Sequence, residues 1–164
     1  MPDPDFIRIL LILPGALLGL TLHEAAHALA AYRLGDPTAK MLGRITLNPL
    51  KHLDLFGTIM IFLVHFGWAK PVPVNPNFFK SPKRDMLLVA LAGPAVNFVL
   101  AVAFGALLRI MPDPETLAGA DLILYQISLY GVIINTVLAV FNLLPIPPLD
   151  GSRMLHLFVP PRYE

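Results

Sequence analysis

A His-Glu-Ala-Ala-His sequence at positions 23–27 is the group of residues in this chain best suited to catalysis. On a helix, this spacing places two imidazoles on one face, one turn apart, where they can hold a Zn²⁺ ion. Glu24 between them is positioned to act as a general base. The cluster lies in an apolar stretch from Phe6 to Leu34. Ionisable side chains are costly inside hydrocarbon, so the motif indicates a functional site and predicts metal-dependent hydrolysis within a membrane.

The composition is that of an integral membrane protein. The chain has 164 residues, 56% hydrophobic and 14% charged, with a mean hydropathy of +0.69, whereas soluble domains carry about 25% charged residues. Its length fits one domain over residues 1–164, and its net charge of +1 gives no indication of nucleic-acid binding. There is no cysteine, so a metal site must use histidine and carboxylate ligands.

Apolar stretches predict an all-α membrane protein, a polytopic bundle of transmembrane helices. Spans are expected at about 6–34, 86–111 and 121–144, each long enough to cross a bilayer. Gly15, Gly19, His23 and His27 are spaced four apart and therefore share one helix face. Small residues on that face allow another helix to approach closely, so the histidines are expected to face the bundle.

The stretch at about 53–68 is apolar but short and interrupted by glycines. Since a span needs about 20 residues, it is expected to be a re-entrant or short β element between the first and second full spans. The next segment, 69–79, contains three closely spaced prolines. It is therefore predicted to be extended rather than helical.

The distribution of charge predicts the orientation. Lysine and arginine gather in segments 33–52 and 69–84, whereas the loop at 112–121 is acidic. Under the positive-inside rule, the two basic segments are cytoplasmic, and the N-terminus and the acidic loop are outside. Both ends of the 53–68 stretch are then cytoplasmic, which supports a re-entrant path. The acidic N-terminus lacks a cleavage pattern, so no cleaved signal peptide is expected.

A catalytic zinc takes three protein ligands and leaves a position open for water, so His23 and His27 need a third partner. Asp150 is the best candidate, because it follows a proline-broken helix end at a similar depth in the cytoplasmic half. The alternative is that Asp150 is only a turn carboxylate, as is common in Asp-Gly pairs. The other candidates are Asp54, Asp85, His52, His65 and His156.

Two asparagines lie within the apolar stretches, Asn97 in the span at 86–111 and Asn142 in that at 121–144. Considered alone, Asn97 is best explained by a hydrogen bond between helices, and Asn142 by a polar cap near the proline break.

Three motifs in the order found here resemble the site-2 protease family of intramembrane zinc metalloproteases, in the compact prokaryotic form without an accessory domain. They are His23-Glu24-x-x-His27, Gly93-x-x-x-Asn97 and Asn142-x-x-Pro145-x-x-x-x-Asp150-Gly151. The segment 66–76 is also similar to a segment of these compact members.

The resemblance implies one zinc ion per chain and cleavage of transmembrane protein substrates by regulated intramembrane proteolysis. It implies a prokaryotic cell membrane, with the active site toward the cytoplasm, and a further hydrophobic segment after the Asp-Gly motif. The residue roles that it implies are zinc ligation by His23, His27 and Asp150, water activation by Glu24, and substrate binding or oxyanion stabilisation by Asn97 and Asn142.

Two other functions were weighed against this one. A non-proteolytic zinc-binding membrane protein, such as a metal carrier, needs a polar path across the membrane, but ionisable residues occur on one side only. A helix-binding scaffold has no use for a buried base at Glu24. We further hypothesise that the extended 69–79 segment and the 53–68 element pair with an unwound substrate strand.

Overall fold

The computed structural model describes residues 3–54, 56–57, 59–60 and 69–155. Its long helices are α1 (Pro4–Arg33), α4 (Pro82–Ile110) and α5 (Gly119–Asn142). All three are long and apolar enough to cross a membrane, and each begins and ends within a few residues of the predicted span. The prediction of an α-helical membrane bundle is therefore confirmed.

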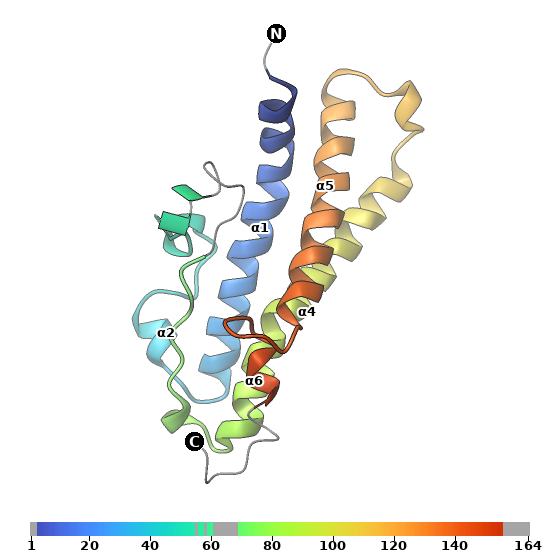
Figure 1. Cartoon of the computed structure of the whole chain (residues 1–164). Helices are drawn as coiled ribbons and strands as arrows, with labels where there is room; N and C mark the ends of the chain where they lie inside the picture. The colour runs from blue at the N-terminus through green and yellow to red at the C-terminus, as the bar shows by residue number, and fades with distance from the viewer. Residues whose placement is uncertain (1–2, 55, 58, 61–68, 156–164) are drawn as a thin grey trace.

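The three long helices pack against one another, with α1 and α5 running in one direction and α4 in the other (Figure 1). The N-terminus and the α4–α5 connection, which contains η3 (Pro114–Thr116), lie at one end of the bundle. The short helices α2 (Thr38–Met41) and α6 (Ser152–Leu155) lie toward the other end. This arrangement places the two predicted outer segments on the same side.

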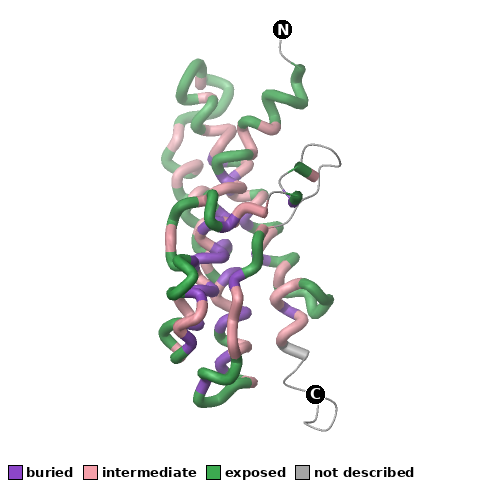
Figure 2. The backbone as a smooth tube through the Cα atoms, turned by 90° about the vertical axis from the view of Figure 1, so that its left-hand side faces the viewer, coloured by how far each residue is buried: buried purple, intermediate pink, exposed green. Residues whose placement is uncertain are grey.

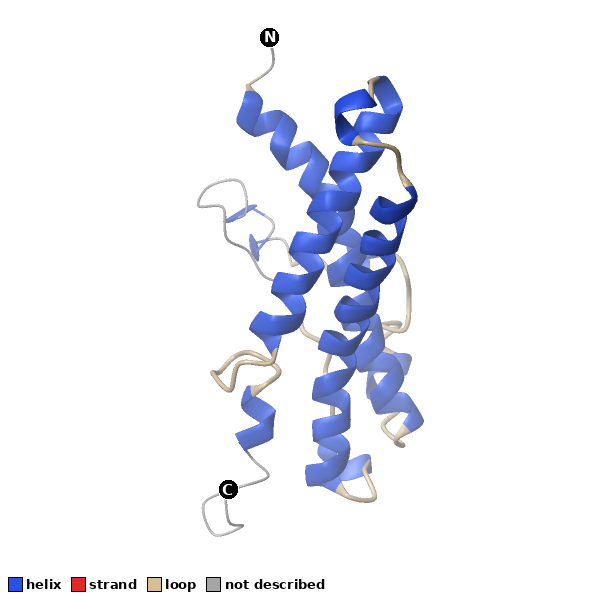
Figure 3. Ribbon diagram, turned by 90° about the vertical axis from the view of Figure 1, so that its right-hand side faces the viewer, coloured by secondary structure: helices blue, strands red, loops and turns tan. Residues whose placement is uncertain are grey.

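The region between α1 and α4 contains two short 3₁₀ helices, η1 (Pro49–Lys51) and η2 (Pro76–Phe78). Leu53 and Ala69 form an isolated antiparallel bridge, which brings the two ends of the predicted re-entrant stretch side by side. Positions 55, 58 and 61–68 of that stretch lie outside the described residues, so its re-entrant path remains a prediction. Within the described ranges, no β pairing longer than this bridge occurs (Figure 3).

Helices α1 and α5 approach closely along the predicted glycine face. A Cβ atom added to Gly15 would lie 2.9 Å from the Cα of Gly131, and one added to Gly19 would lie 2.5 Å from Oδ1 of Asn135. Figure 2 shows that buried residues gather in the middle of the bundle and in the half away from the N-terminus. The outer faces of α4 and α5 expose large apolar side chains, such as Phe98 and Val140, as expected for helices surrounded by lipid.

Candidate metal centre

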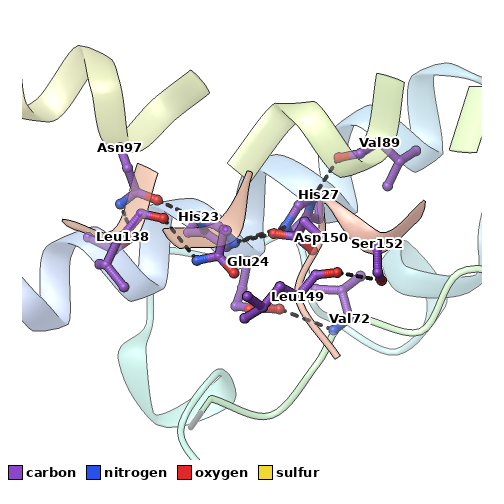
Figure 4. Close-up of polar contacts among 12 residues, drawn as sticks. His23, Glu24, His27, Val72, Val89, Asn97, Leu138, Leu149, Asp150 and Ser152 are labelled. Atoms are coloured by element: carbon purple, nitrogen blue, oxygen red, sulfur yellow. Dashed lines mark hydrogen bonds and ion pairs between the residues drawn. The ribbon is translucent and has the colours of Figure 1, made fainter. Parts of the chain in front are cut away.

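Three potential ligand atoms converge between α1 and the chain that follows α5 (Figure 4). Nε2 of His23 and Nε2 of His27 lie 3.0 Å apart. One carboxylate oxygen of Asp150, Oδ2, lies 2.9 Å from Nε2 of His23 and 3.1 Å from Nε2 of His27. Both histidines are buried, and Asp150 is partly buried. The structure thus brings together the three residues that were predicted to bind zinc.

The backbone after α5 turns back sharply to bring Asp150 to the histidines. The N–H of Gly151 donates to the backbone carbonyl of Asn142 at 2.7 Å. A Cβ atom at Gly151 would lie 2.4 Å from the carbonyl oxygen of Leu143, so this close return requires glycine. The backbone carbonyl of residue 142 and the glycine at 151 therefore set the position of Asp150.

The outward-facing nitrogen of each imidazole has its own partner. Nδ1 of His27 lies 2.7 Å from the carbonyl oxygen of Val89 on α4, which can only accept. Nδ1 of His23 lies 2.5 Å from Oδ1 of Asn97 on α4. When both Nδ1 atoms carry a hydrogen and donate, both Nε2 atoms present lone pairs to Asp150.

Three acceptor atoms pointing at one another repel unless a cation lies between them. In a tetrahedral site with Zn–N distances of about 2.0–2.1 Å, neighbouring ligand atoms are about 3.3 Å apart. The separations of 2.9–3.1 Å found here are close to that value. The donor set of two imidazoles and one carboxylate therefore fits zinc, with a fourth position left for water.

The charge state of Asp150 agrees with a role as a ligand. Burial raises the pKa of its carboxyl, but in the metal-free site hydrogen bonds from the Nε2–H groups of protonated His23 and His27, and the charge of those rings, outweigh burial and hold that pKa below its usual range. Asp150 is therefore ionised at neutral pH, as a metal ligand must be.

Glu24 lies beside the three ligands, on the edge of a small cavity of about 80 Å³. One of its carboxylate oxygens, Oε2, accepts a hydrogen bond from the backbone N–H of Val72 at 3.1 Å. The cavity is large enough for water. It is lined by Glu24, His27, Pro71, Val72, Val74, Val89, Ala90, Pro148, Asp150 and Arg153. A buried carboxylate next to a water-sized space and a metal-binding cluster can act as a general base.

The segment from Lys70 to Phe79, here called the strap, passes over this cavity. The guanidinium of Arg44 donates to the carbonyl oxygens of Lys70 and Pro71, at 2.5 and 3.2 Å. Burial lowers the pKa of Arg44, whereas the negative charge of Glu24 raises it. Farther along the strap, Asp36 accepts from the backbone N–H of Asn75 at 2.7 Å. The strap is extended up to η2, as predicted, and buried side chains hold its backbone in place.

The two predicted asparagines lie in different surroundings. The side chain of Asn97 is fully buried, and its Nδ2 donates to Asn135 and to the carbonyl oxygen of Gly19, at 2.9 and 3.2 Å. Asn142 is only partly buried, and its Nδ2 donates to the carbonyl oxygen of Leu138 on its own helix at 3.0 Å. Thus Asn97 contacts a predicted ligand, whereas the side chain of Asn142 bonds locally.

The other candidate ligands are engaged elsewhere. The carboxylate of Asp85 accepts from the N–H of Ser81 at the start of α4, and that of Asp54 accepts from Gly57. His52 is buried, with its Nε2 2.9 Å from the carbonyl oxygen of Thr46. His65 and His156 lie outside the described residues.

Three features near the centre were not predicted from the sequence: the contact of Gly93, a residue of the second motif, with the histidines, and the positions of Asn135 and Arg153. A Cβ atom at Gly93 would lie 2.5–2.6 Å from ring atoms of His23 and His27, so α4 needs glycine where it passes the histidines. Asn135 is buried beside Asn97. The sequence does contain a signal for Asn135, because it is a polar residue within an apolar span, two turns before Asn142. Arg153 lines the cavity from α6, but its sequence context alone gives no such indication.

Comparisons with known proteins agree with this arrangement. The chain is 50% identical over 147 residues to "Putative zinc metalloprotease YwhC" of Bacillus subtilis (strain 168), covering 88% of this chain and 67% of the relative. It is 36% identical over 162 residues to "Putative zinc metalloprotease Rip2" of Mycolicibacterium smegmatis, covering 94% of this chain and 60% of that protein. It is 27% identical over 163 residues to "Zinc metalloprotease MJ0392" of Methanocaldococcus jannaschii, covering 99% of this chain and 38% of that protein.

The search of solved structures found no match. The family model described as "Peptidase family M50" matches residues 12–120 and 114–162, nearly the whole chain. Together with the converging histidines and aspartate, this match confirms the resemblance to site-2 proteases, and the chain belongs to peptidase family M50.

Proposed function

We propose that residues 1–164 form the core of an intramembrane zinc endopeptidase that hydrolyses peptide bonds within or near transmembrane segments of other proteins. The single observation that carries this proposal is the cluster of His23, His27 and Asp150 with Glu24 beside it. His23 lies about 15 Å from the end of α1 at 1.5 Å per residue, well inside a helix that can span a membrane. One zinc ion per chain is the proposed cofactor, and His23, His27 and Asp150 are its proposed ligands.

The residues around the cavity fit a hydrolytic mechanism. A bound zinc ion would lower the pKa of water and polarise the scissile carbonyl. Glu24 takes the proton of the attacking water and returns it to the leaving amine. The N–H of Val72 holds Oε2 of Glu24 in place and leaves the other carboxylate oxygen for this proton transfer.

The substrate must reach the cavity in an extended form, because helical hydrogen bonds shield its carbonyls. Within the described part of the chain, the N–H and C=O of Val74 on the strap have no hydrogen-bonding partner. These groups can pair with an unwound substrate segment by β-augmentation. Asn142 is the proposed substrate or oxyanion contact, because among the described residues its Oδ1 and one amide hydrogen have no partner. Asn97 uses its amide within the buried network, so we assign it a positioning role instead.

The charge distribution supports an orientation with the metal centre toward the cytoplasm. Single cysteines can test this cleanly, since the chain has none. Lys40→Cys and Lys80→Cys should react with a membrane-impermeant reagent only from the cytoplasmic side, and Glu115→Cys only from outside. Labelling of positions 40 and 80 from opposite sides would show that 53–68 crosses the membrane.

The function is tested by separating the base from the ligands. Purified Glu24→Gln protein should keep about one zinc per chain but lose cleavage of a transmembrane substrate, because Glu24 is a base and not a ligand. His23→Ala and Asp150→Ala should lose both zinc and cleavage, whereas Asp85→Ala should keep both. Retained cleavage in Glu24→Gln would disprove the mechanism, and zinc transport without cleavage by the wild type would indicate a carrier.

A further inference from the structure

We infer that Asn135 is a positioning residue for the metal centre, acting through Asn97 to hold the imidazole of His23 in the tautomer that can bind a cation. The inference rests on the proposed function, because it concerns the orientation of one proposed ligand. Asn135 and Asn97 are both fully buried, on α5 and α4. Together, the two asparagines connect the metal centre by hydrogen bonds to the interior of the helix bundle.

The hydrogen bonds of this network run in one direction. Nδ2 of Asn135 donates to the backbone carbonyls of Gly131 at 2.9 Å and Gly15 at 3.3 Å. Oδ1 of Asn135 accepts from Nδ2 of Asn97 at 2.9 Å. Oδ1 of Asn97 then accepts from Nδ1 of His23 at 2.5 Å. The network thus begins at two backbone carbonyls and ends at the imidazole.

Backbone carbonyls can only accept, so they fix the orientation of the Asn135 amide. If that amide were rotated by half a turn, its oxygen would face two carbonyl oxygens. The fixed oxygen of Asn135, together with the carbonyl of Gly19, in turn requires Nδ2 of Asn97 to point toward them. The oxygen of Asn97 must therefore point toward His23.

The orientation of Asn97 decides which nitrogen of His23 carries the hydrogen. A neutral imidazole has one N–H and one lone pair. Because Nδ1 of His23 faces the oxygen of Asn97, it carries the hydrogen and donates it. Nε2 therefore keeps a lone pair for the cation. If the amide of Asn97 were reversed, the hydrogen would move to Nε2 and occupy the metal-binding position. Partners of this kind commonly set the tautomer and orientation of metal-bound histidines.

The close approach of α1 and α5 makes this network possible. A Cβ atom at Gly19 would lie 2.5 Å from Oδ1 of Asn135, so α1 needs a glycine beside this amide. A purely structural explanation is that the asparagines only join three helices. That explanation predicts that removal of Asn135 lowers stability without a specific effect on the metal.

The test measures metal binding by purified protein, with Zn²⁺ competition against a chelator and the visible spectrum of the Co²⁺ form. Asn135→Leu keeps the approximate shape but removes the amide. It should weaken zinc binding about 10- to 100-fold and alter the Co²⁺ spectrum.

Ser128→Ala is the matched control, because Ser128 is fully buried on the same helix and donates within it to Leu124. The control should leave both readouts unchanged. Thermal unfolding of the metal-free proteins identifies any loss of structure, and Asn135→Ala replaces the leucine variant if that variant does not fold.

A rescue experiment distinguishes positioning from structure. An aspartate at position 97 presents an acceptor to His23 whichever oxygen faces it. In the Asn97→Asp background, Asn135→Leu should therefore reduce zinc affinity by less than about threefold, a strong coupling between the two positions. Unchanged affinity and spectrum in Asn135→Leu alone, or an equal loss in both backgrounds, would overturn the inference. Failure of the proposed function is seen separately, as cleavage retained in Glu24→Gln or zinc retained in His23→Ala.

Discussion

Residues of the metal centre and of the strap line the same cavity, and they are held in different ways. The ligand histidines belong to one helix, α1, and their outward-facing nitrogens contact groups of a second helix, α4. The strap instead has extended backbone from Lys70 to Asn75, and side chains of other segments bind that backbone. Two packed helices thus hold the histidine ligands, whereas a few hydrogen bonds from side chains hold the backbone of the strap.

This difference indicates that the metal centre and the strap have separate roles in the site. The cavity of about 80 Å³ holds water but not a peptide, so we expect the strap, which lines it, to shift when the proposed substrate reaches Glu24. Changes at the metal centre should therefore alter zinc content, whereas changes in the strap should alter cleavage with zinc retained.

The largest effect is expected at Gly93. A methyl group there would lie 2.5–2.6 Å from ring atoms of both ligand histidines, closer than packed atoms can approach. Gly93→Ala should displace the imidazoles, abolish zinc binding and cleavage, and destabilise the protein by about 1–3 kcal/mol through overpacking. Zinc content by elemental analysis and cleavage of a transmembrane substrate measure the outcome.

Gly105 provides the matched control for Gly93, because it lies on the same helix and a Cβ atom there would have its nearest neighbour, Val132, at 4.0 Å. Gly105→Ala should keep zinc and activity. Normal zinc content in Gly93→Ala would show that the imidazoles are free to move, and the contrast between a rigid centre and a movable strap would then be lost.

A smaller effect is expected from proline at two positions of the strap. Val72→Pro removes the N–H that binds Glu24, a hydrogen bond to a charged group worth about 1.5–3 kcal/mol. Val74→Pro removes the N–H that has no partner among the described residues and is proposed above to pair with substrate. Both variants should retain zinc. Val72→Pro should lower kcat about 10- to 100-fold through misplacement of the base, whereas Val74→Pro should mainly raise KM. Loss of zinc in either variant would show that the strap supports the metal centre directly.

The sequence was sufficient to predict the parts of the site that depend on local spacing. The positions of His23, Glu24 and His27 follow from helical periodicity, and the three spans follow from length and hydropathy. The predicted topology also placed Asp150 level with the histidines, and the structure brings these residues together. The glycine face of α1 predicted a close helix approach, which Gly15 and Gly19 make with α5.

The remaining features depend on contacts between segments far apart in the chain. Periodicity cannot show that Gly93 lies against the imidazoles, because that contact depends on how α4 passes α1. The contact between Val72 and Glu24 joins residues 48 positions apart, so no local pattern reveals it. The network of Asn135 requires three helices to be placed together. An isolated asparagine in a span indicates a buried hydrogen bond but does not identify its partner.

The smallest predicted effect concerns Asp36, which anchors the strap far from the metal. Its carboxylate is fully buried and accepts from the N–H groups of Thr38 and Asn75, at 2.9 and 2.7 Å. Burial raises the pKa of Asp36, but these bonds and that from the Thr38 hydroxyl outweigh it and hold the pKa below its usual value. Asp36→Ala should therefore cost about 1–2 kcal/mol of unfolding free energy at neutral pH.

The lowered pKa gives this loss a defined pH dependence. A carboxyl whose pKa is lower in the folded than in the unfolded state stabilises the fold fully above the unfolded value of about 3.9, and this contribution disappears as the pH falls through the folded pKa. The stability difference between wild type and Asp36→Ala should be constant above about pH 5 and shrink below about pH 4. Denaturant unfolding in detergent across this range measures it. Asp113→Ala, which removes a similar but exposed bond to Glu115, should cost less. If the Asp36 difference instead grew on acidification, the carboxylate would not be what holds the strap at Asn75.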